Sequence, residues 1–350
     1  YDVIHNRGGF DIIIGNPPYV AIKKIKYLKI DVLFKCSDLY AYVVKRCVEL
    51  LNKKSKLGFI IMHNIAFSRS FKDLRNLLQK TGNTYFSFFS RIPSGLFSGD
   101  VRVRNCILLY TPSTEIKQSY TTKLHRWNSD YRNYLFSNIT YSRFNFNDTI
   151  PMYPSNLLSA FYNMQKTPNL TESRIGKELY YKKTAYNWLS VSNIKPPCYD
   201  KNNNLIEQTQ LASLIIDREV YPYYLLLLNG KLFFSKWLIF GDDFHLTKDD
   251  LLSFNINFKN ISKEDKELLN ELYNEFTDKI EATTQFKLNA GINIGTFNTA
   301  SLWYITERSD KIFLKYLTSD VLKLYNSIDN HIYSTVKLNT SDSGTEEIDE

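Results

Sequence analysis

Four consecutive residues, Asn16, Pro17, Pro18 and Tyr19, are the part of this chain best suited to chemistry, and they directly follow the apolar run FDIIIG. The Asn16 side chain offers a carbonyl acceptor. Each proline fixes its own φ and lacks an N–H, so the Pro17 carbonyl is held rigidly as a second acceptor. Two fixed acceptors suit an NH2 group, and the Tyr19 ring offers a face for stacking. The tetrapeptide therefore predicts a site for a planar substrate that carries an amino group.

The segments around the tetrapeptide alternate between strand and helix patterns. Residues 10–15 (FDIIIG) and 58–62 (GFIIM) are short apolar runs, the pattern of buried strands in a parallel sheet. Apolar side chains at helical spacing predict helices over residues 37–51 and 68–80. This alternation predicts an open α/β sheet with right-handed crossovers. Such sheets bind their ligands at the carboxyl ends of the strands, which is where the tetrapeptide lies.

The pattern changes along the rest of the chain. Residues 84–89 and 105–110 are expected to form an antiparallel edge of the sheet, and the polar stretch 111–120 marks the weakening of the α/β pattern. Beyond it the patterns are mixed, with helices expected at residues 155–165, 263–280 and 310–327, and strand-like aromatic runs at residues 221–228 and 232–240. The helix at 263–280 has the clearest start, because Ser262 and Asp265 have the spacing of a capping box.

The positive charge is concentrated in the first part of the chain. The formal net charge is +8, but residues 1–150 hold 23 basic and 10 acidic residues, while the last ten residues hold five acids and no base. A basic surface in the first part would suit a polyanion such as nucleic acid. Basic residues follow both the tetrapeptide and Phe97. They either contact DNA phosphates or form an ordinary solvated surface, and the sequence leaves both interpretations open. These residues are Lys23, Lys24, Lys26, Arg102 and Arg104.

Several classes of protein are excluded by composition. No run of eighteen apolar residues is present, so we expect no membrane span and a cytoplasmic protein. The four cysteines lack any CxxC pair and the five histidines are scattered, so neither a disulfide scaffold nor a metal site is expected. Asp242 and Asp243 lack the partner residues of a nuclease site and are expected to belong to a loop and helix cap.

The tetrapeptide and its surroundings resemble motif IV of the amino-group methyltransferases that use S-adenosylmethionine, above all the adenine-N6 DNA methyltransferases. Residues 37–51 and 57–78 look like the elements that follow motif IV in that family, and residues 91–110 (RIPSGLFSGDVRVRNCILLY) look like its motif VIII. Residues 179–191 and 289–310 are similar to the carboxyl-terminal portion of the large methyltransferases of type IIG restriction-modification enzymes. These enzymes are prokaryotic, so the resemblance implies a protein near the nucleoid.

The resemblance implies a mechanism for named residues. Asn16 and the Pro17 carbonyl would accept the two hydrogens of a flipped adenine's amino group, and Pro18 completes the rigid turn. Tyr19 would stack on one face of the base and Phe97, in the segment like motif VIII, on the other, because the base must leave the duplex to be reached. The implied partners are double-stranded DNA and the methyl donor S-adenosylmethionine, without a metal or a covalent intermediate.

One departure from the family pattern concerns the methyl donor. The family binds it with a glycine-rich turn, and no GxG occurs anywhere in the chain. Only 15 residues precede Asn16, and the first residue is Tyr. We therefore expect the cofactor-binding half to reside in an upstream segment or a second chain, and we expect no tight binding of S-adenosylmethionine by this chain alone. A second departure is His63 with Asn64, where the family often has proline.

The expected organisation is a partial Rossmann-like methyltransferase sheet followed by a mixed α+β target recognition domain. The expected ranges are residues 1–115 for the methyltransferase half, 116–150 for a connecting segment, 151–340 for target recognition and 341–350 for an acidic tail. Two alternatives remain: a protein-glutamine or RNA amino-group methyltransferase, and a non-catalytic DNA-binding subunit. The 331 residues after Tyr19 favour DNA methylation, because they leave room for a recognition domain.

Overall fold

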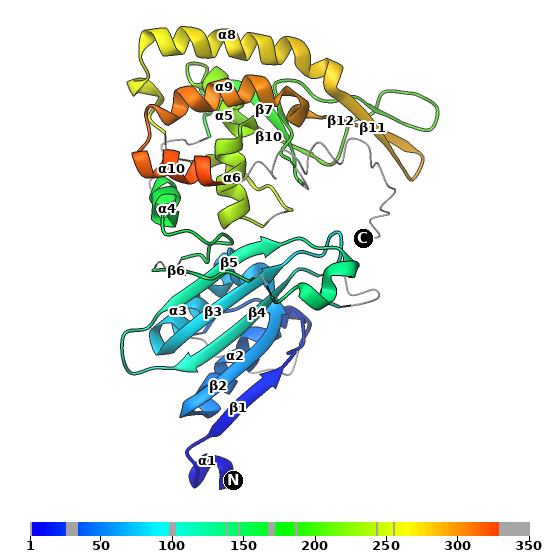
Figure 1. Cartoon of the computed structure of the whole chain (residues 1–350). Helices are drawn as coiled ribbons and strands as arrows, with labels where there is room; N and C mark the ends of the chain where they lie inside the picture. Colours follow the sequence, from blue (N-terminus) through cyan, green and yellow to red (C-terminus); the bar gives the residue numbers. More distant parts are fainter. Residues whose placement is uncertain are drawn as a thin grey trace. The chain divides into compact units, whose positions relative to one another are not determined.

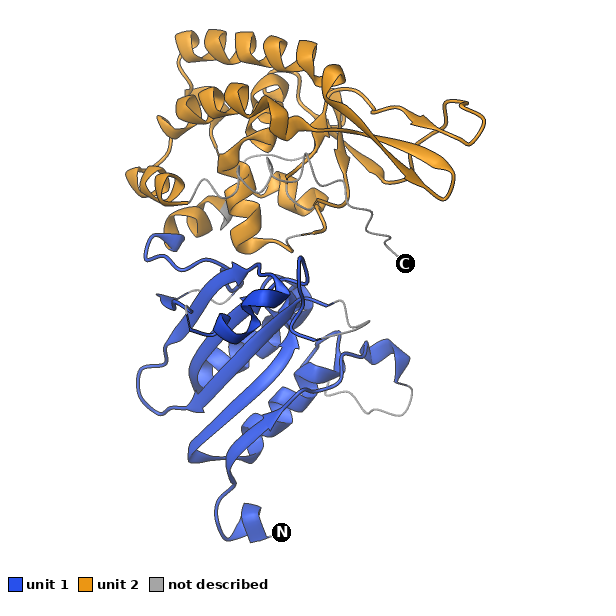
Figure 2. Cartoon of the chain, turned by 45° about the vertical axis from the view of Figure 1, so that its right-hand side comes forward, with its two compact units in different colours: residues 1–158 blue, residues 159–350 orange. Residues whose placement is uncertain are grey.

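The computed structural model describes residues 2–25, 34–97, 103–137, 139–145, 148–166, 172–185, 188–242, 244–254 and 256–328. The chain divides into two compact units, Tyr1–Leu158 and Ser159–Glu350 (Figure 2). The fold class is α/β with a mixed parallel and antiparallel sheet, as the sequence predicts. No helix among the described ranges is long and apolar enough to cross a membrane.

The first unit is built on a six-stranded sheet with the order β1-β2-β4-β3-β5-β6. Strands β1, β2, β3 and β5 run parallel, whereas β4 and β6 run antiparallel to their neighbours. The strands, with the short helix α1 at the start of the chain, are α1 Asp2–His5, β1 Phe10–Gly15, β2 Leu51–Met62, β3 Gly82–Phe89, β4 Asn105–Pro112, β5 Ser119–His125 and β6 Ser142–Phe144. Strands β5 and β6 fall within residues 116–150, where the sequence predicts a connecting segment.

Two amphipathic helices cover one face of this sheet, as Figure 1 shows: α2 (Leu39–Leu50) and α3 (Lys72–Thr81). Alternate β2 residues Leu57, Phe59 and Ile61 are buried, the period of two expected for a strand with one covered face. Helix α3 stops where Gly82 begins β3. The first strand-helix-strand-helix order of the sequence prediction is therefore confirmed in this unit.

Two predictions for the sheet are wrong in position. Strand β1 is an edge strand rather than a buried one, and Ile12 and Ile14 are 63% and 80% exposed. Strand β2 is its only partner among the described strands, so β1 has no described strand on its outer side. Strands β3 and β4 do pair antiparallel, but they lie in the middle of the sheet, because β5 adds beside β3.

The second unit combines helices with two three-stranded sheets, ordered β10-β7-β8 and β11-β12-β9. Its helices are α4 Leu158–Lys166, α5 Tyr221–Asn229, α6 Lys231–Phe240, α7 Lys248–Leu252, α8 Lys263–Ile280, α9 Trp303–Leu314 and α10 Ser319–Ser327. Its strands are β7 Lys177–Lys182, β8 Val191–Ser192, β9 Cys198–Tyr199, β10 Leu211–Ile216, β11 Thr284–Asn289 and β12 Ile292–Phe297.

The strand-like runs predicted at residues 221–228 and 232–240 are wrong, because these residues form helices α5 and α6. Nearly every side chain of both helices is buried, so neither shows an apolar stripe, and a short apolar run without a stripe does not distinguish helix from strand. The helix predicted at residues 310–327 is likewise two helices, α9 and α10, which meet at a turn near Tyr316.

The start of α8 follows the predicted cap in part. The Ser262 hydroxyl accepts a hydrogen bond of 3.1 Å from the Asp265 backbone N–H, as predicted. The Asp265 carboxylate instead accepts bonds from Lys315 Nζ at 2.8 Å and from the Tyr316 hydroxyl at 2.7 Å. The carboxylate that would have closed the capping box therefore ties α8 to the end of α9.

Candidate active site

The parallel strands bring several loops together at one edge of the first sheet. Because β1, β2, β3 and β5 are parallel, their carboxyl ends share an edge with the amino end of the antiparallel β4. The segments at this edge are residues 16–20 after β1, 63–65 after β2, 90–97 after β3, 103–104 before β4 and 126–136 after β5. Ligands of open α/β sheets bind at this edge.

The tetrapeptide after β1 presents its amide to solvent. Asn16 is exposed, and its side chain makes no hydrogen bond to another described residue, whereas Pro17 is buried and holds the turn against the sheet. Pro18 is exposed and Tyr19 is half-buried. The Asn16 amide oxygen is therefore available to a ligand.

The Tyr19 ring is fixed through its hydroxyl. This hydroxyl donates to the Ile60 carbonyl oxygen at 3.1 Å and accepts from Asn105 Nδ2 at 3.2 Å. Burial raises the pKa of Tyr19 to about 12, so the hydroxyl stays protonated at neutral pH and keeps both bonds. Tyr19 therefore behaves as a rigid aromatic surface and not as an acid or base.

Asn105 is a positioning residue that the sequence analysis missed. It is the first residue of β4, it is 1% exposed, and its cross-strand partners are Met62 and Phe89. The bond from Asn105 to Tyr19 therefore joins the loop after β1 to the ends of β2 and β3. The signal in the sequence was a lone amide at the start of the apolar run NCILLY, where a buried polar side chain needs a partner.

Phe97 lies at the same edge, half-buried, at the end of the described part of the loop after β3. Leu96 beside it is buried in a cluster with Phe89 and Trp127. The Ser94 backbone N–H donates to the Trp127 carbonyl at 3.1 Å, which holds the loop against the segment after β5. No contact between Phe97 and the tetrapeptide is found among the described residues, so its stacking role stays a prediction.

The predicted phosphate contacts divide into three groups. Lys23 and Lys24 are exposed on a 3₁₀ turn, Ile22–Lys24, a few residues after the tetrapeptide. Arg104 is buried, and its backbone carbonyl accepts a hydrogen bond of 3.1 Å from the His63 N–H. Lys26 and Arg102 lie outside the described residues. Phosphate contact stays a prediction for all five.

The loop after β2 is held by buried polar groups. The Tyr40 hydroxyl donates to Asn64 Oδ1 at 2.7 Å, and Asn64 Nδ2 donates to Asp38 Oδ2 at 3.2 Å. The Arg75 side chain, which the sequence analysis also missed, donates to the carbonyls of Ile65 and Ser68 at 2.7 and 2.9 Å. Asn64, which stands where the family often has proline, therefore serves to anchor α2 to this loop.

The part of the chain that the structure describes contains no set of side chains suited to bind a metal ion. No group of three or more His, Cys, Asp or Glu residues there could hold a metal ion. The four cysteines are free thiols. Asp242 accepts a hydrogen bond from the backbone N–H of His245 at 3.3 Å, as expected of a loop residue, and Asp243 lies outside the described residues.

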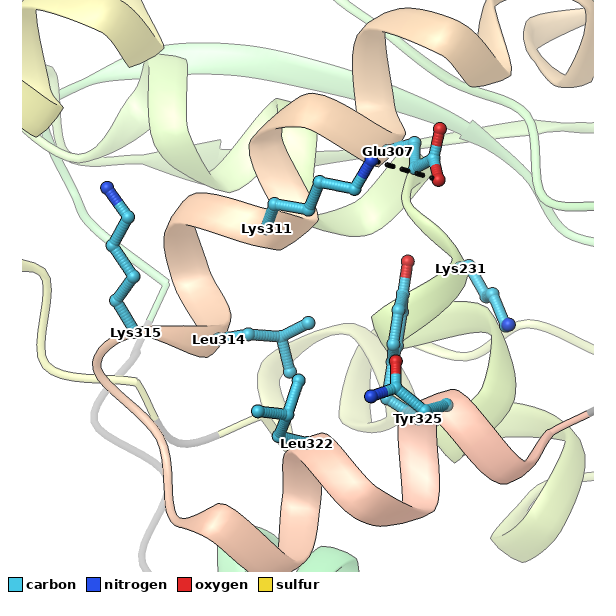
Figure 3. A pocket seen from close by; sticks show the side chains of 8 residues that line it. Lys231, Glu307, Lys311, Leu314, Lys315, Leu322 and Tyr325 are labelled. Atoms are coloured by element: carbon cyan, nitrogen blue, oxygen red, sulfur yellow. Dashed lines mark ion pairs between the residues drawn. The ribbon is translucent and has the colours of Figure 1, made fainter.

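The second unit contains a cavity of about 420 Å³ next to α9 and α10, shown in Figure 3. Three lysines line it, but Lys311 Nζ lies 3.2 Å from Glu307 and Lys315 Nζ lies 2.8 Å from Asp265. Carboxylates therefore offset two of the three cations. Its lining is Lys231, Glu307, Lys311, Leu314, Lys315, Leu322, Tyr325 and Asn326, and none of these was predicted as a site residue.

The fold and the site together define a class of protein. It has a mixed α/β sheet that presents an amide, a rigid turn and an aromatic ring at the carboxyl end of its first strand. Within this class, residues 1–90 match the family model described as Eco57I restriction-modification methylase. The match covers the tetrapeptide, α2, β2 and α3. No curated protein matches the chain.

Three solved protein–DNA complexes overlap with parts of this chain at TM-scores below 0.5. The type IIL enzyme MmeI in complex with DNA has a TM-score of 0.47 and 10% identity, over 93% of this chain and 57% of that one. The type ISP enzyme LlaBIII bound to DNA has 0.41 and 11%, over 97% and 37%. The DrdV–DNA complex has 0.30 and 18%, over 40% and 18%. This chain thus spans 57% or less of the length of each.

Proposed function

We propose that the chain is the catalytic-loop half, together with a target recognition region, of a site-specific adenine-N6 DNA methyltransferase of a restriction-modification system. The observation that carries the proposal is the tetrapeptide at the carboxyl end of β1, where Asn16 is exposed and the Tyr19 ring is fixed by two hydrogen bonds. The family match over residues 1–90 supports it. Double-stranded DNA is the proposed substrate.

The proposed residues act on the amino group of an adenine that has left the duplex. Asn16 Oδ1 and the Pro17 carbonyl oxygen accept its two hydrogens, which draws the nitrogen lone pair out of conjugation with the ring and makes it a better nucleophile. Tyr19 stacks on one face of the base, and Phe97 stacks on the other. Each such stack is worth about 1–3 kcal/mol, so the two rings offset the unstacking cost of about a few kcal/mol.

S-adenosylmethionine is the proposed methyl donor, but the residues of this chain do not form a complete site for it. The glycine-rich turn that would let the backbone approach the donor is missing from the sequence. Asn16, Pro17 and Tyr19 account for binding and orienting the acceptor base only.

We further propose that an upstream segment or a second chain completes the sheet on the outer side of β1 and carries the cofactor-binding half. Ile14 is 80% exposed and Leu109 is 44% exposed, and both pair in register with Gly58, so they lie in one row on the face opposite Phe59. An apolar edge strand left open is a liability that proteins normally cover. A parallel sheet covered on both faces would bury this row.

Nucleoside analysis tests the proposed reaction. The chain is produced together with the segment or chain that supplies the cofactor half, incubated with DNA and a labelled methyl donor, and the DNA is digested to nucleosides. We expect label in N6-methyladenine. Label in N4-methylcytosine, or only in RNA or protein added to the same reaction, would contradict the proposed substrate, and DNA binding without any transfer would leave only a non-catalytic subunit.

A further inference from the structure

The segment after β5, residues 126–136, exposes an unusual group of aromatic rings. Tyr131, Tyr134 and Phe136 are 63%, 66% and 58% exposed, and the first two belong to the 3₁₀ helix Ser129–Tyr134. A single exposed apolar side chain is ordinary, but three large rings within six residues indicate a surface that meets a partner.

Buried contacts attach this segment to the loop after β3. Trp127 is 7% exposed and packs with Phe89 and Leu96. The Arg132 guanidinium donates to the Leu96 carbonyl at 2.8 Å and lies 5.7 Å from the centre of the Trp127 ring. These contacts fix the segment to the loop that carries Phe97.

The location and the charge of the segment identify its partner as nucleic acid. It lies at the carboxyl edge of the sheet, the edge that also presents Asn16. Residues 126–136 hold two basic residues, Arg126 and Arg132, and one acid, Asp130. Basic side chains interleaved with exposed aromatic rings suit a phosphate backbone and stacked bases together.

We propose that residues 126–136 bind the distorted part of the DNA beside the flipped base, a role that rests on the proposed function of the tetrapeptide. Tyr131 and Tyr134 stack on bases that lose a pairing or a stacking partner when the adenine leaves the duplex, and Arg126 contacts a phosphate. The Phe136 ring lies 5.8 Å from the ring of Phe89 and so attaches the segment to the end of β3.

Binding to two duplexes tests the proposal with the purified full chain. One duplex is fully paired, and the other is identical except for one mismatched adenine. We expect the wild-type chain to prefer the mismatched duplex, and Tyr131→Ala with Tyr134→Ala to weaken binding to it by about ten-fold or more, since two stacks are lost. Tyr131→Phe with Tyr134→Phe keeps both rings and should bind like the wild type. Arg126→Gln should reduce the salt dependence of binding by about one phosphate contact.

Matched controls come from the opposite edge of the same sheet. Ile116 is 77% exposed in the β4–β5 connection, and Lys80 is exposed near the end of α3, so Ile116→Ala and Lys80→Gln should leave binding to both duplexes unchanged.

Wild-type affinity of the double alanine variant for both duplexes would overturn the proposal. So would self-association of the wild-type chain that the double variant abolishes, because the patch would then be a protein interface. Binding is measured without the methyl donor, so failure of the methylation assay alone would count against the proposed function and not against this surface.

Discussion

The Asn105 side chain donates a hydrogen bond of 3.2 Å to the Tyr19 hydroxyl and thereby joins the start of β4 to the loop after β1. Phe89, the cross-strand partner of Asn105, is the last residue before the loop that leads to Phe97. One buried amide therefore connects the strand ends that support both proposed stacking rings. We treat Asn105 as a positioning residue, because it acts through Tyr19.

Replacement of Asn105 tests this connection. Asn105→Ala removes one of the two bonds that fix the Tyr19 ring, and a bond of this kind is worth about 1 kcal/mol, so we expect single-turnover methylation by the completed enzyme to fall about five-fold. Duplex binding should not change. Asn83→Ala is the matched control, because Asn83 also bonds within this sheet, accepting from the Gln118 N–H at 2.8 Å, but at the opposite edge. Equal methylation rates for Asn105→Ala and Asn83→Ala would refute the positioning role.

Arg75 should be essential for the stability of the first unit. Its side chain is 1% exposed and bonds three backbone carbonyls, those of Ile65, Ser68 and Asp148. Burial lowers the pKa of Arg75 to about 10, so it remains charged at neutral pH. Arg75→Met removes all three bonds. The Ser68 carbonyl still accepts from the Phe71 N–H at 3.1 Å, but the carbonyls of Ile65 and Asp148 lose their Arg75 donor, so we expect the free energy of unfolding to fall by about 3 kcal/mol. Urea unfolding measures this.

Arg46 provides the comparison for Arg75, because it is exposed and its partner is Glu49 at 3.0 Å on the same helix. Arg46→Met should change the free energy of unfolding by less than about 0.5 kcal/mol. Equal effects of the two substitutions would show that the three carbonyl bonds of Arg75 contribute little.

Asp310 should make stability depend on pH. It is fully buried, it accepts a hydrogen bond of 2.9 Å from the Leu232 N–H, and burial raises its pKa to about 8 from the ordinary 3.8. The folded chain thus holds a proton that the unfolded chain releases near pH 4. The contribution of this proton to the free energy of unfolding is fully present below about pH 4. It is lost as the pH rises toward about 8.

Asp310→Asn keeps an acceptor for Leu232 and cannot ionise. We therefore expect the melting temperature of the wild type to fall more than that of Asp310→Asn between pH 5.5 and 8.5. Parallel curves for the two proteins over this range would show that Asp310 does not hold the proton.

The open edge of β1 predicts a solubility effect. Ile14→Lys places a charge where apolar surface is now exposed, so we expect folding to be retained and light scattering from concentrated solutions to fall. The same variant should assemble poorly with the cofactor half. Ile116→Lys, at a position 77% exposed in the β4–β5 connection and not beside β1, should assemble like the wild type. Normal assembly of Ile14→Lys would count against completion of the sheet at β1.

The sequence predicted best where a local pattern determines the structure. Ser262 marks the start of α8, because a helix cap is a local interaction. Helices α5 and α6 were predicted as strands because side chains buried on all sides leave no period to detect. The exposure of Ile14 and the bond from Asn105 to Tyr19 depend on which strands become neighbours, and a strand's own residues do not specify its neighbours.

Methylation by an Asn16→Ala variant of the completed enzyme, measured beside its affinity for the same DNA, tests the central claim most directly. Asn16 is exposed and makes no hydrogen bond to another described residue, so its replacement should leave the fold intact. We predict that formation of N6-methyladenine falls by at least about a hundred-fold, as on loss of a hydrogen bond made to the reacting group, while DNA affinity stays within about two-fold of wild type. Unchanged formation of N6-methyladenine by Asn16→Ala would contradict the account.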